Sequence, residues 1–169
     1  VIMKQKRCNC FRSDKNIITV NKYVELDTQL QLVSEKWFDL KFDDRLYIGI
    51  EDVRIFYDVE TTRPIFIGTG YHKNNYIGIV AGEYDYQSVG LNSTDIVPNF
   101  NNVSCEKNWV YVDYNNSTHV IYEWYPLKIC KISDSTLSLI ETRAMPLMFS
   151  RIRGSTCGFK YSKPTTGST

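Results

Sequence analysis

Apolar and polar residues alternate along much of the chain, which is the pattern of β-strands with one buried face. The alternation is clearest in residues 23–33, where Val24, Leu26 and Leu32 are interleaved with acidic and amide residues. This segment predicts either one long strand or a pair of strands. Further runs rich in Val, Ile and aromatic residues predict strands at residues 17–20, 37–42, 47–57, 64–71, 76–82, 107–114, 119–132 and 137–141.

Turn-forming residues separate several of these runs. Asn115, Asn116 and Ser117 lie between two apolar runs and predict a β-hairpin. Residues 83–105 are polar, contain Pro98 and several asparagines, and predict a loop. Residues 27–37 and 145–153 can be fitted to a helical pattern, but neither stretch has good capping residues. The sequence therefore predicts an all-β protein.

The length of 169 residues fits one domain. Residues 1–16 are expected to be a poorly ordered N-terminal segment, residues 17–161 the β-rich domain, and residues 162–169 a flexible tail. The net charge is +1 and no basic tract occurs, which argues against nucleic acid as a partner. No apolar run approaches the ~20 residues that cross a bilayer, so no membrane span is expected.

Cysteine and histidine usage gives no sign of a metal or cofactor. The five cysteines are an odd number without metal-ligand spacing, which favours reduced thiols and a cytoplasmic protein. His72 and His119 have no metal-binding or triad context, so neither a metal nor a cofactor is expected. Four N-x-S/T triplets argue weakly for secretion, which stays open.

The run at residues 47–57 carries three charges, Glu51, Asp52 and Arg54, inside an otherwise apolar strand. Side chains two residues apart share a strand face, so Asp52 and Arg54 should lie together and Glu51 should point the other way. One interpretation is an ion pair that joins this strand to its neighbour. The other is a carboxyl group and an anion-binding arginine in a carbohydrate or phosphate site.

Similar polar motifs recur at intervals. The next is E-K-N-W at residues 106–109, and R-G-S follows at residues 153–155, so the intervals are 55 residues from 51 to 106 and 47 residues from 106 to 153. Spacings of roughly 40–50 residues are typical of β-propeller blades, each of about four strands. Polar groups that open successive blades would converge on the central channel. The alternative is a β-sandwich in which the spacing is accidental.

Three segments together resemble a known family. Residues 49–55, G-I-E-D-V-R-I, resemble the G-x-E-D-P-R-I motif of the five-bladed β-propellers of glycoside hydrolase family 130, the mannoside phosphorylases, and their glycosyltransferase-associated relatives. Residues 106–109 resemble the K-N motif of a later blade, and the segment from residue 149 that includes R-G-S at residues 153–155 is similar to the glycosyltransferase-associated propellers. The resemblance extends over about residues 45–160. It implies about three blades of five, with further blades or another chain completing the fold.

The resemblance implies a role for Asp52 as the general acid, which passes a proton through a substrate hydroxyl to the glycosidic oxygen. Making or breaking a glycosidic bond requires such a proton donor. Apolar neighbours such as Ile50, Ile55 and Phe56 would favour the protonated form. Val53 replaces the family's proline without removing a chemical group.

The expected partner is a carbohydrate or sugar phosphate, gripped by basic residues. Arg54, Lys107 and Arg153 are the candidates for holding phosphate, and Lys107 matches the family pattern best. The remaining predicted substrate-binding residues are Glu51, Asn108, Trp109, Tyr125 and Ser155. Trp109 and Tyr125 would stack on sugar faces, with burial in the core as the alternative.

Three functional hypotheses follow from the sequence. The first is a carbohydrate-active propeller that transfers or phosphorolyses a glycosyl group. The second is a non-catalytic sugar-binding domain of the same fold. The third is a structural all-β module unrelated to sugars.

Overall fold

The computed structural model describes residues 17–38, 47–85, 87, 90–103 and 105–158, and within them the chain is all-β, as predicted. The strands are β1 (Ile17–Ile18), β2 (Lys22–Leu26), β3 (Leu32–Trp37), β4 (Tyr47–Ile48), β5 (Glu51–Tyr57), β6 (Pro64–Tyr71), β7 (Ile77–Asp85), β8 (Gly90–Pro98), β9 (Val110–Tyr114), β10 (Ser117–Trp124), β11 (Leu127–Ser133) and β12 (Thr136–Arg143). One 3-10 helix, Leu147–Arg151, follows. The predicted N-terminal segment and C-terminal tail lie outside the described residues.

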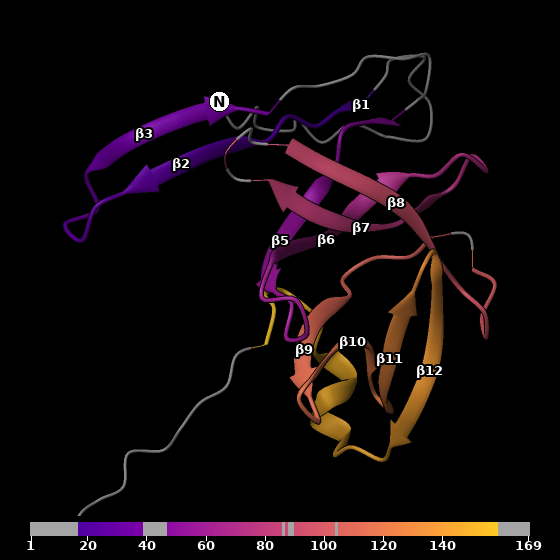
Figure 1. The fold of residues 1–169 in the computed structure, drawn as a ribbon. Coiled ribbons are helices and arrows are strands. Elements are labelled where there is room, and N and C mark those ends of the chain that lie inside the picture. The colour runs from indigo at the N-terminus through magenta and orange to yellow at the C-terminus, as the bar shows by residue number, and fades with distance from the viewer. Residues whose placement is uncertain (1–16, 39–46, 86, 88–89, 104, 159–169) are drawn as a thin grey trace, which may run out of the picture.

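Two antiparallel meanders of four strands form the body of the molecule (Figure 1). The first runs β5-β6-β7-β8 and the second β9-β10-β11-β12, and β8 pairs in parallel with β12 to join them into one eight-stranded sheet. The sheet nearly closes on itself. At the closing edges Phe56 of β5 stacks on Tyr111 of β9, with 5.8 Å between the ring centroids.

A shared core lies between the two meanders. Its buried members are Ile67, Ile79, Ala81, Ile96, Trp109, Tyr111, Val120, Cys130, Leu137 and Cys157. They come from strands of both meanders, from Trp109 directly before β9, and from the segment after the 3-10 helix. This packing is compatible with both predicted architectures, neighbouring propeller blades and a sandwich.

The first two charged motifs lie where the two meanders begin. Glu51 is the first residue of β5, and Glu106 to Trp109 directly precede β9. The third motif, which begins at Arg153, lies in an irregular segment beyond the 3-10 helix. The described residues thus form two four-stranded units, the two-stranded hairpin of β2 and β3, and a short parallel pair of β1 and β4, where the resemblance implied about three blades.

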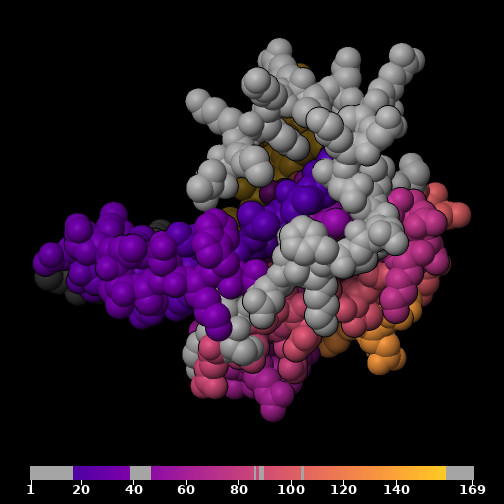
Figure 2. Space-filling model, turned by 90° about the horizontal axis from the view of Figure 1, so that it is seen from above, coloured from indigo at the N-terminus to yellow at the C-terminus, as the bar shows by residue number. Residues whose placement is uncertain are grey.

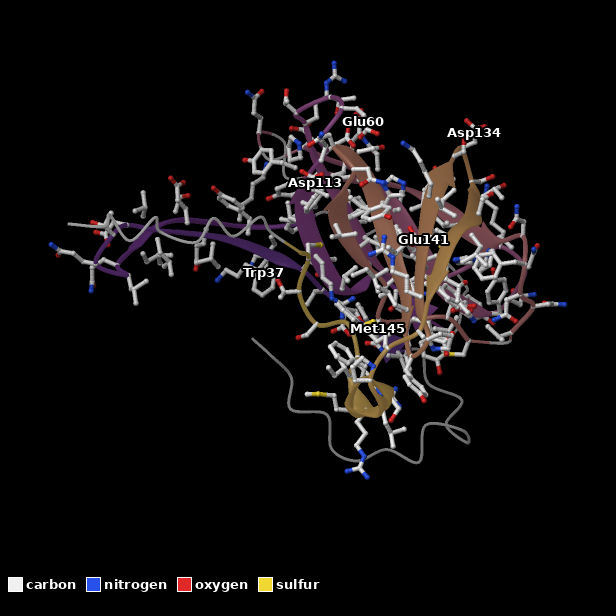
Figure 3. All side chains as sticks on the ribbon, turned by 90° about the horizontal axis from the view of Figure 1, so that it is seen from below. Trp37, Glu60, Asp113, Asp134, Glu141 and Met145 are labelled. Atoms are coloured by element: carbon white, nitrogen blue, oxygen red, sulfur yellow. The ribbon has the colours of Figure 1, made fainter. Side chains whose placement is uncertain are left out.

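The hairpin of β2 and β3 extends away from the body (Figure 2). Figure 3 shows Trp37, the last residue of β3. The same view shows Asp134 and Met145 near opposite ends of β12. At the base of the hairpin, Tyr23 and Phe38 pack against a second buried cluster of Phe66, Val80 and Tyr84. The hairpin therefore covers part of the outer face of the first meander.

Residues 152–158 run between β5 and β9. Gly158 N donates to Tyr111 O of β9 at 2.8 Å, and Arg54 of β5 donates from Nε to Ser155 O at 2.8 Å. Gly154 passes so close to Asn108 that a β-carbon there would lie 2.1 Å from the Asn108 carbonyl oxygen. This C-terminal segment therefore bridges the two edges of the nearly closed sheet.

Two predictions about individual elements need correction. Residues 83–105 were predicted as a loop, but β7 extends to Asp85 and β8 occupies Gly90–Pro98. The outward-facing middle of β8 is polar, so its hydrophobic pattern is weak. Residues 119–132 form two strands, not one, because the chain turns between Trp124 and Leu127. Residues 145–153, which can be fitted to a helical pattern, contain the 3-10 helix Leu147–Arg151.

The hairpin predicted at Asn115 and Asn116 is confirmed. Tyr114 of β9 pairs with Ser117 of β10 across this two-residue turn. Both asparagines have positive φ, 52° and 56°. Tight hairpin turns of this kind require positive φ at both central positions, and asparagine tolerates it.

Candidate functional site

Strand β5 begins with an irregular stretch that carries the first charged motif. The pairing with β6 shifts register between Glu51 and Arg54, and Asp52 lies in the left-handed region with φ of 52°. Asp52 and Arg54 share a face as predicted, with 3.7 Å between Asp52 Oδ2 and Arg54 Nη2. The bulge therefore keeps the predicted pair together although the strand is not regular.

Arg54 is the buried member of this pair. Its side chain is 9% exposed, against 66% for Asp52. Besides the Nε hydrogen bond to Ser155 O, Nη2 lies 3.4 Å from Gly154 O. Nη1 is buried and has no hydrogen-bond partner among the described residues. An unpaired buried donor costs about 1–3 kcal/mol, so an acceptor from outside the described residues would stabilise this guanidinium.

Arg54 lines an open pocket of about 350 Å³, here called the Arg54 pocket. The other lining residues are Asp52, Val53, Asn108, Gly154 and Ser155. They come from three segments far apart in sequence: the bulge in β5, the short stretch before β9 that contains Asn108, and the segment after the 3-10 helix. Four of the predicted site residues, Asp52, Arg54, Asn108 and Ser155, therefore meet at one place.

The Arg54 pocket combines a cation with groups that donate and accept hydrogen bonds. Asn108 supplies a carboxamide, Ser155 a hydroxyl and Asp52 a carboxyl group. The predicted apolar enclosure of Asp52 is not formed, because Phe56 packs against the core between the meanders and Ile50 against the second cluster. The pocket can thus bind an anion or a hydroxylated ligand and offers a solvent-accessible carboxyl group.

The structure places the other predicted site residues outside this pocket. Lys107 and Arg153 are exposed neighbours of lining residues. Tyr125 is 40% exposed in the turn between β10 and β11. Trp109 is 1% exposed and belongs to the core, so a sugar ring cannot stack on it without displacing it. Glu51 is exposed and lines a separate small cavity with β4 and β6.

Glu106 is a functional candidate that was not among the predicted site residues. It is 6% exposed, and its carboxylate accepts hydrogen bonds from Tyr122 Oη at 2.8 Å and Trp109 Nε1 at 3.2 Å. Desolvation by burial raises the pKa of Glu106, and these two hydrogen bonds oppose the rise. Its place as the first residue of the E-K-N-W motif was the sequence feature that could have identified it.

No protein family, curated protein or solved structure matches this chain. Within the described residues, no helix has the length and apolarity that a membrane crossing requires. The functional assignment therefore depends on the geometry of the site and on the motif resemblance.

Proposed function

We propose that the Arg54 pocket binds a carbohydrate that carries an anionic group, such as a sugar phosphate. The observation that supports this most directly is the convergence of Asp52, Arg54, Asn108 and Ser155 on one pocket. Arginine is well suited to phosphate because it offers several donors on a planar group. Amide and hydroxyl groups suit the alternating donors and acceptors of a sugar.

We further propose that Asp52 is the proton donor in glycosyl transfer or phosphorolysis. In phosphorolysis a phosphate oxygen bonds to the anomeric carbon, the glycosidic C–O bond breaks, and the proton of Asp52 reaches the leaving oxygen. Arg54 would hold the phosphate in line for attack. Lys107 and Arg153, exposed beside lining residues, would attract the anion toward the pocket.

A non-catalytic sugar-binding protein is the second candidate, and one observation favours it. The side chain of Asp52 is 66% exposed, so it lacks the apolar surroundings expected around a general acid. Binding would then use the same pocket and the same four residues, without bond cleavage.

Calorimetric titration with a panel of hexose 1-phosphates tests the binding. Asn108→Gly is the informative variant, because Asn108 has φ of 66° and glycine removes the amide without straining the backbone. Loss of one or two hydrogen bonds should weaken binding about 10-fold. Asn115→Gly is the matched control, since Asn115 has φ of 52° in a hairpin turn outside the pocket. The proposal fails if no member of the panel binds, or if both variants bind as the wild type does.

A turnover assay separates the two candidates. The same sugar phosphates are incubated with acceptor sugars, and release of inorganic phosphate is followed. If the chain is an enzyme, Asp52→Asn should abolish release while the affinity measured by titration changes little. Binding without any release by the wild-type protein would favour the non-catalytic candidate.

A further inference from the structure

A second pocket adjoins the segment that carries Asn108. It has a volume of about 400 Å³ and is called the Glu106 pocket here. Its lining residues are Asn74, Tyr76, Val97, Pro98, Asn101, Asn102, Val103 and Glu106. They belong to the β6–β7 turn, the end of β8 and the connection from β8 to β9.

The lining of the Glu106 pocket combines apolar side chains with polar groups and contains no lysine or arginine among the described residues. Three carboxamides and a phenol supply hydrogen-bond donors and acceptors in about equal measure. The side chains of Asn74 and Asn102 and the Tyr76 hydroxyl make no hydrogen bond to another described residue. Burial, and then the nearby Asp95 and Glu106, raise the pKa of Tyr76, so its hydroxyl keeps its proton and remains a donor.

A hydrogen-bond chain fixes one wall of this pocket. Asn101 Nδ2 donates to Tyr122 Oη at 2.6 Å, and Tyr122 Oη donates to Glu106 Oε1 at 2.8 Å. Trp109, anchored in the core, donates from Nε1 to the other carboxylate oxygen of Glu106. A wall held in this way loses little conformational freedom when a ligand binds, which favours affinity.

The chemistry of the Glu106 pocket selects a neutral, hydroxylated ligand. An anion would find no cationic partner on the described lining and would meet the Glu106 carboxyl group. Because burial disfavours the ionised form of Glu106, attraction of a cation is weakened as well. A sugar unit, with several hydroxyl groups that both donate and accept, fits this set of partners.

The two pockets are neighbours along the chain. Glu106 lines one and Asn108 lines the other, and two residues of backbone span at most about 7 Å. The backbones of these two lining residues therefore lie no farther apart than about the length of a sugar unit. Lys107, between them, is exposed.

We propose that the Glu106 pocket binds a neutral sugar unit of the same ligand whose anionic unit occupies the Arg54 pocket. The ligand of this protein is then an oligosaccharide with an anionic end, not a single sugar phosphate. This inference rests on the function proposed for the Arg54 pocket.

Calorimetry with two sets of ligands tests the inference. One set is the hexose 1-phosphates, and the other is the disaccharide 1-phosphates made by extending them through each common linkage. The best disaccharide phosphate should bind the wild-type protein about 10-fold more tightly than the best hexose phosphate, as two added hydrogen bonds would give. Asn102→Ala should remove most of this gain and leave binding of the hexose phosphate unchanged.

Asn92→Ala is the matched control, because Asn92 is an exposed asparagine of β8 that lines neither pocket. Unchanged thermal unfolding of both variants would show that they fold. The inference is overturned if no disaccharide phosphate binds more tightly than the hexose phosphates, or if Asn102→Ala and Asn92→Ala behave alike. If neither set of ligands binds, the proposed function itself is refuted, and the inference fails with it.

Discussion

Replacing Gly154 by alanine tests how the C-terminal segment closes the sheet and shapes the Arg54 pocket. The added β-carbon would lie 2.1 Å from Asn108 O and 2.8 Å from Val110 Cγ1. The φ of Gly154 lies outside the left-handed region, so alanine there would meet a steric clash but no backbone strain. The nearest atom is a backbone carbonyl directly before β9 and cannot move aside as a side-chain tip can. The segment must therefore shift, and the carbonyl groups that accept from Arg54 shift with it.

The expected loss of stability combines two effects. Overpacking a tight site costs typically about 1–3 kcal/mol, and weakening the hydrogen bonds of a buried guanidinium adds about 1.5–3 kcal/mol. We expect Gly154→Ala to lower the free energy of unfolding by about 3 kcal/mol or more, measured by urea denaturation. For a domain of this size, that corresponds to a Tm lower by roughly 6–12 °C.

Gly158→Ala is the matched control in the same segment. Its β-carbon would lie 3.1 Å from Val112 Cγ2, a side-chain atom that can give way, so the cost should stay within about 1 kcal/mol. Equal stability of the two variants would refute the packing described here for residues 152–158.

Three further predictions concern charge and burial. Hydrogen bonds, mainly from Ser117, hold the pKa of Glu60 below its usual range. The wild type should therefore be more stable than Glu60→Gln at neutral pH. This difference in the free energy of unfolding should be lost as the pH falls below about 4.5. Burial raises the pKa of Glu106, so the stability of the wild type relative to Glu106→Gln should fall as the pH rises above about 4.5, the opposite trend in the same denaturation assay. Phe66 is 0% exposed, so Phe66→Ala should cost about 3–5 kcal/mol, whereas Leu147→Ala, at a side chain 73% exposed, should stay within about 0.5 kcal/mol.

Much of the strand pattern was predictable because it depends on local alternation. The hairpin at Asn115 and Asn116 was predictable from turn-forming residues that tolerate positive φ. Strand β8 was not, since its pairing with β7 is made by the backbone while its middle side chains are polar and exposed. Backbone pairing of an outward-facing strand leaves little trace in the hydrophobic pattern.

The candidate site, like the fold, was predictable from the sequence only in part. The alternation rule predicted that Asp52 and Arg54 share a face, and the ion-pair distance agrees with it. The sequence alone could not show that Trp109 fills the core while its neighbour Asn108 faces a pocket, because both belong to the same short polar motif, E-K-N-W. The close approach of Gly154 to Asn108 depends on a contact between segments 46 residues apart, which no local pattern records.

The most direct test of the central claim, that three distant segments form one ligand site, is a nuclear magnetic resonance titration with the tightest-binding sugar phosphate. If the three segments form one site, backbone amides near Arg54, Asn108 and Ser155 should shift together and follow one saturating binding curve. Shifts confined to a single segment, or saturable shifts elsewhere with these three regions unchanged, would contradict it.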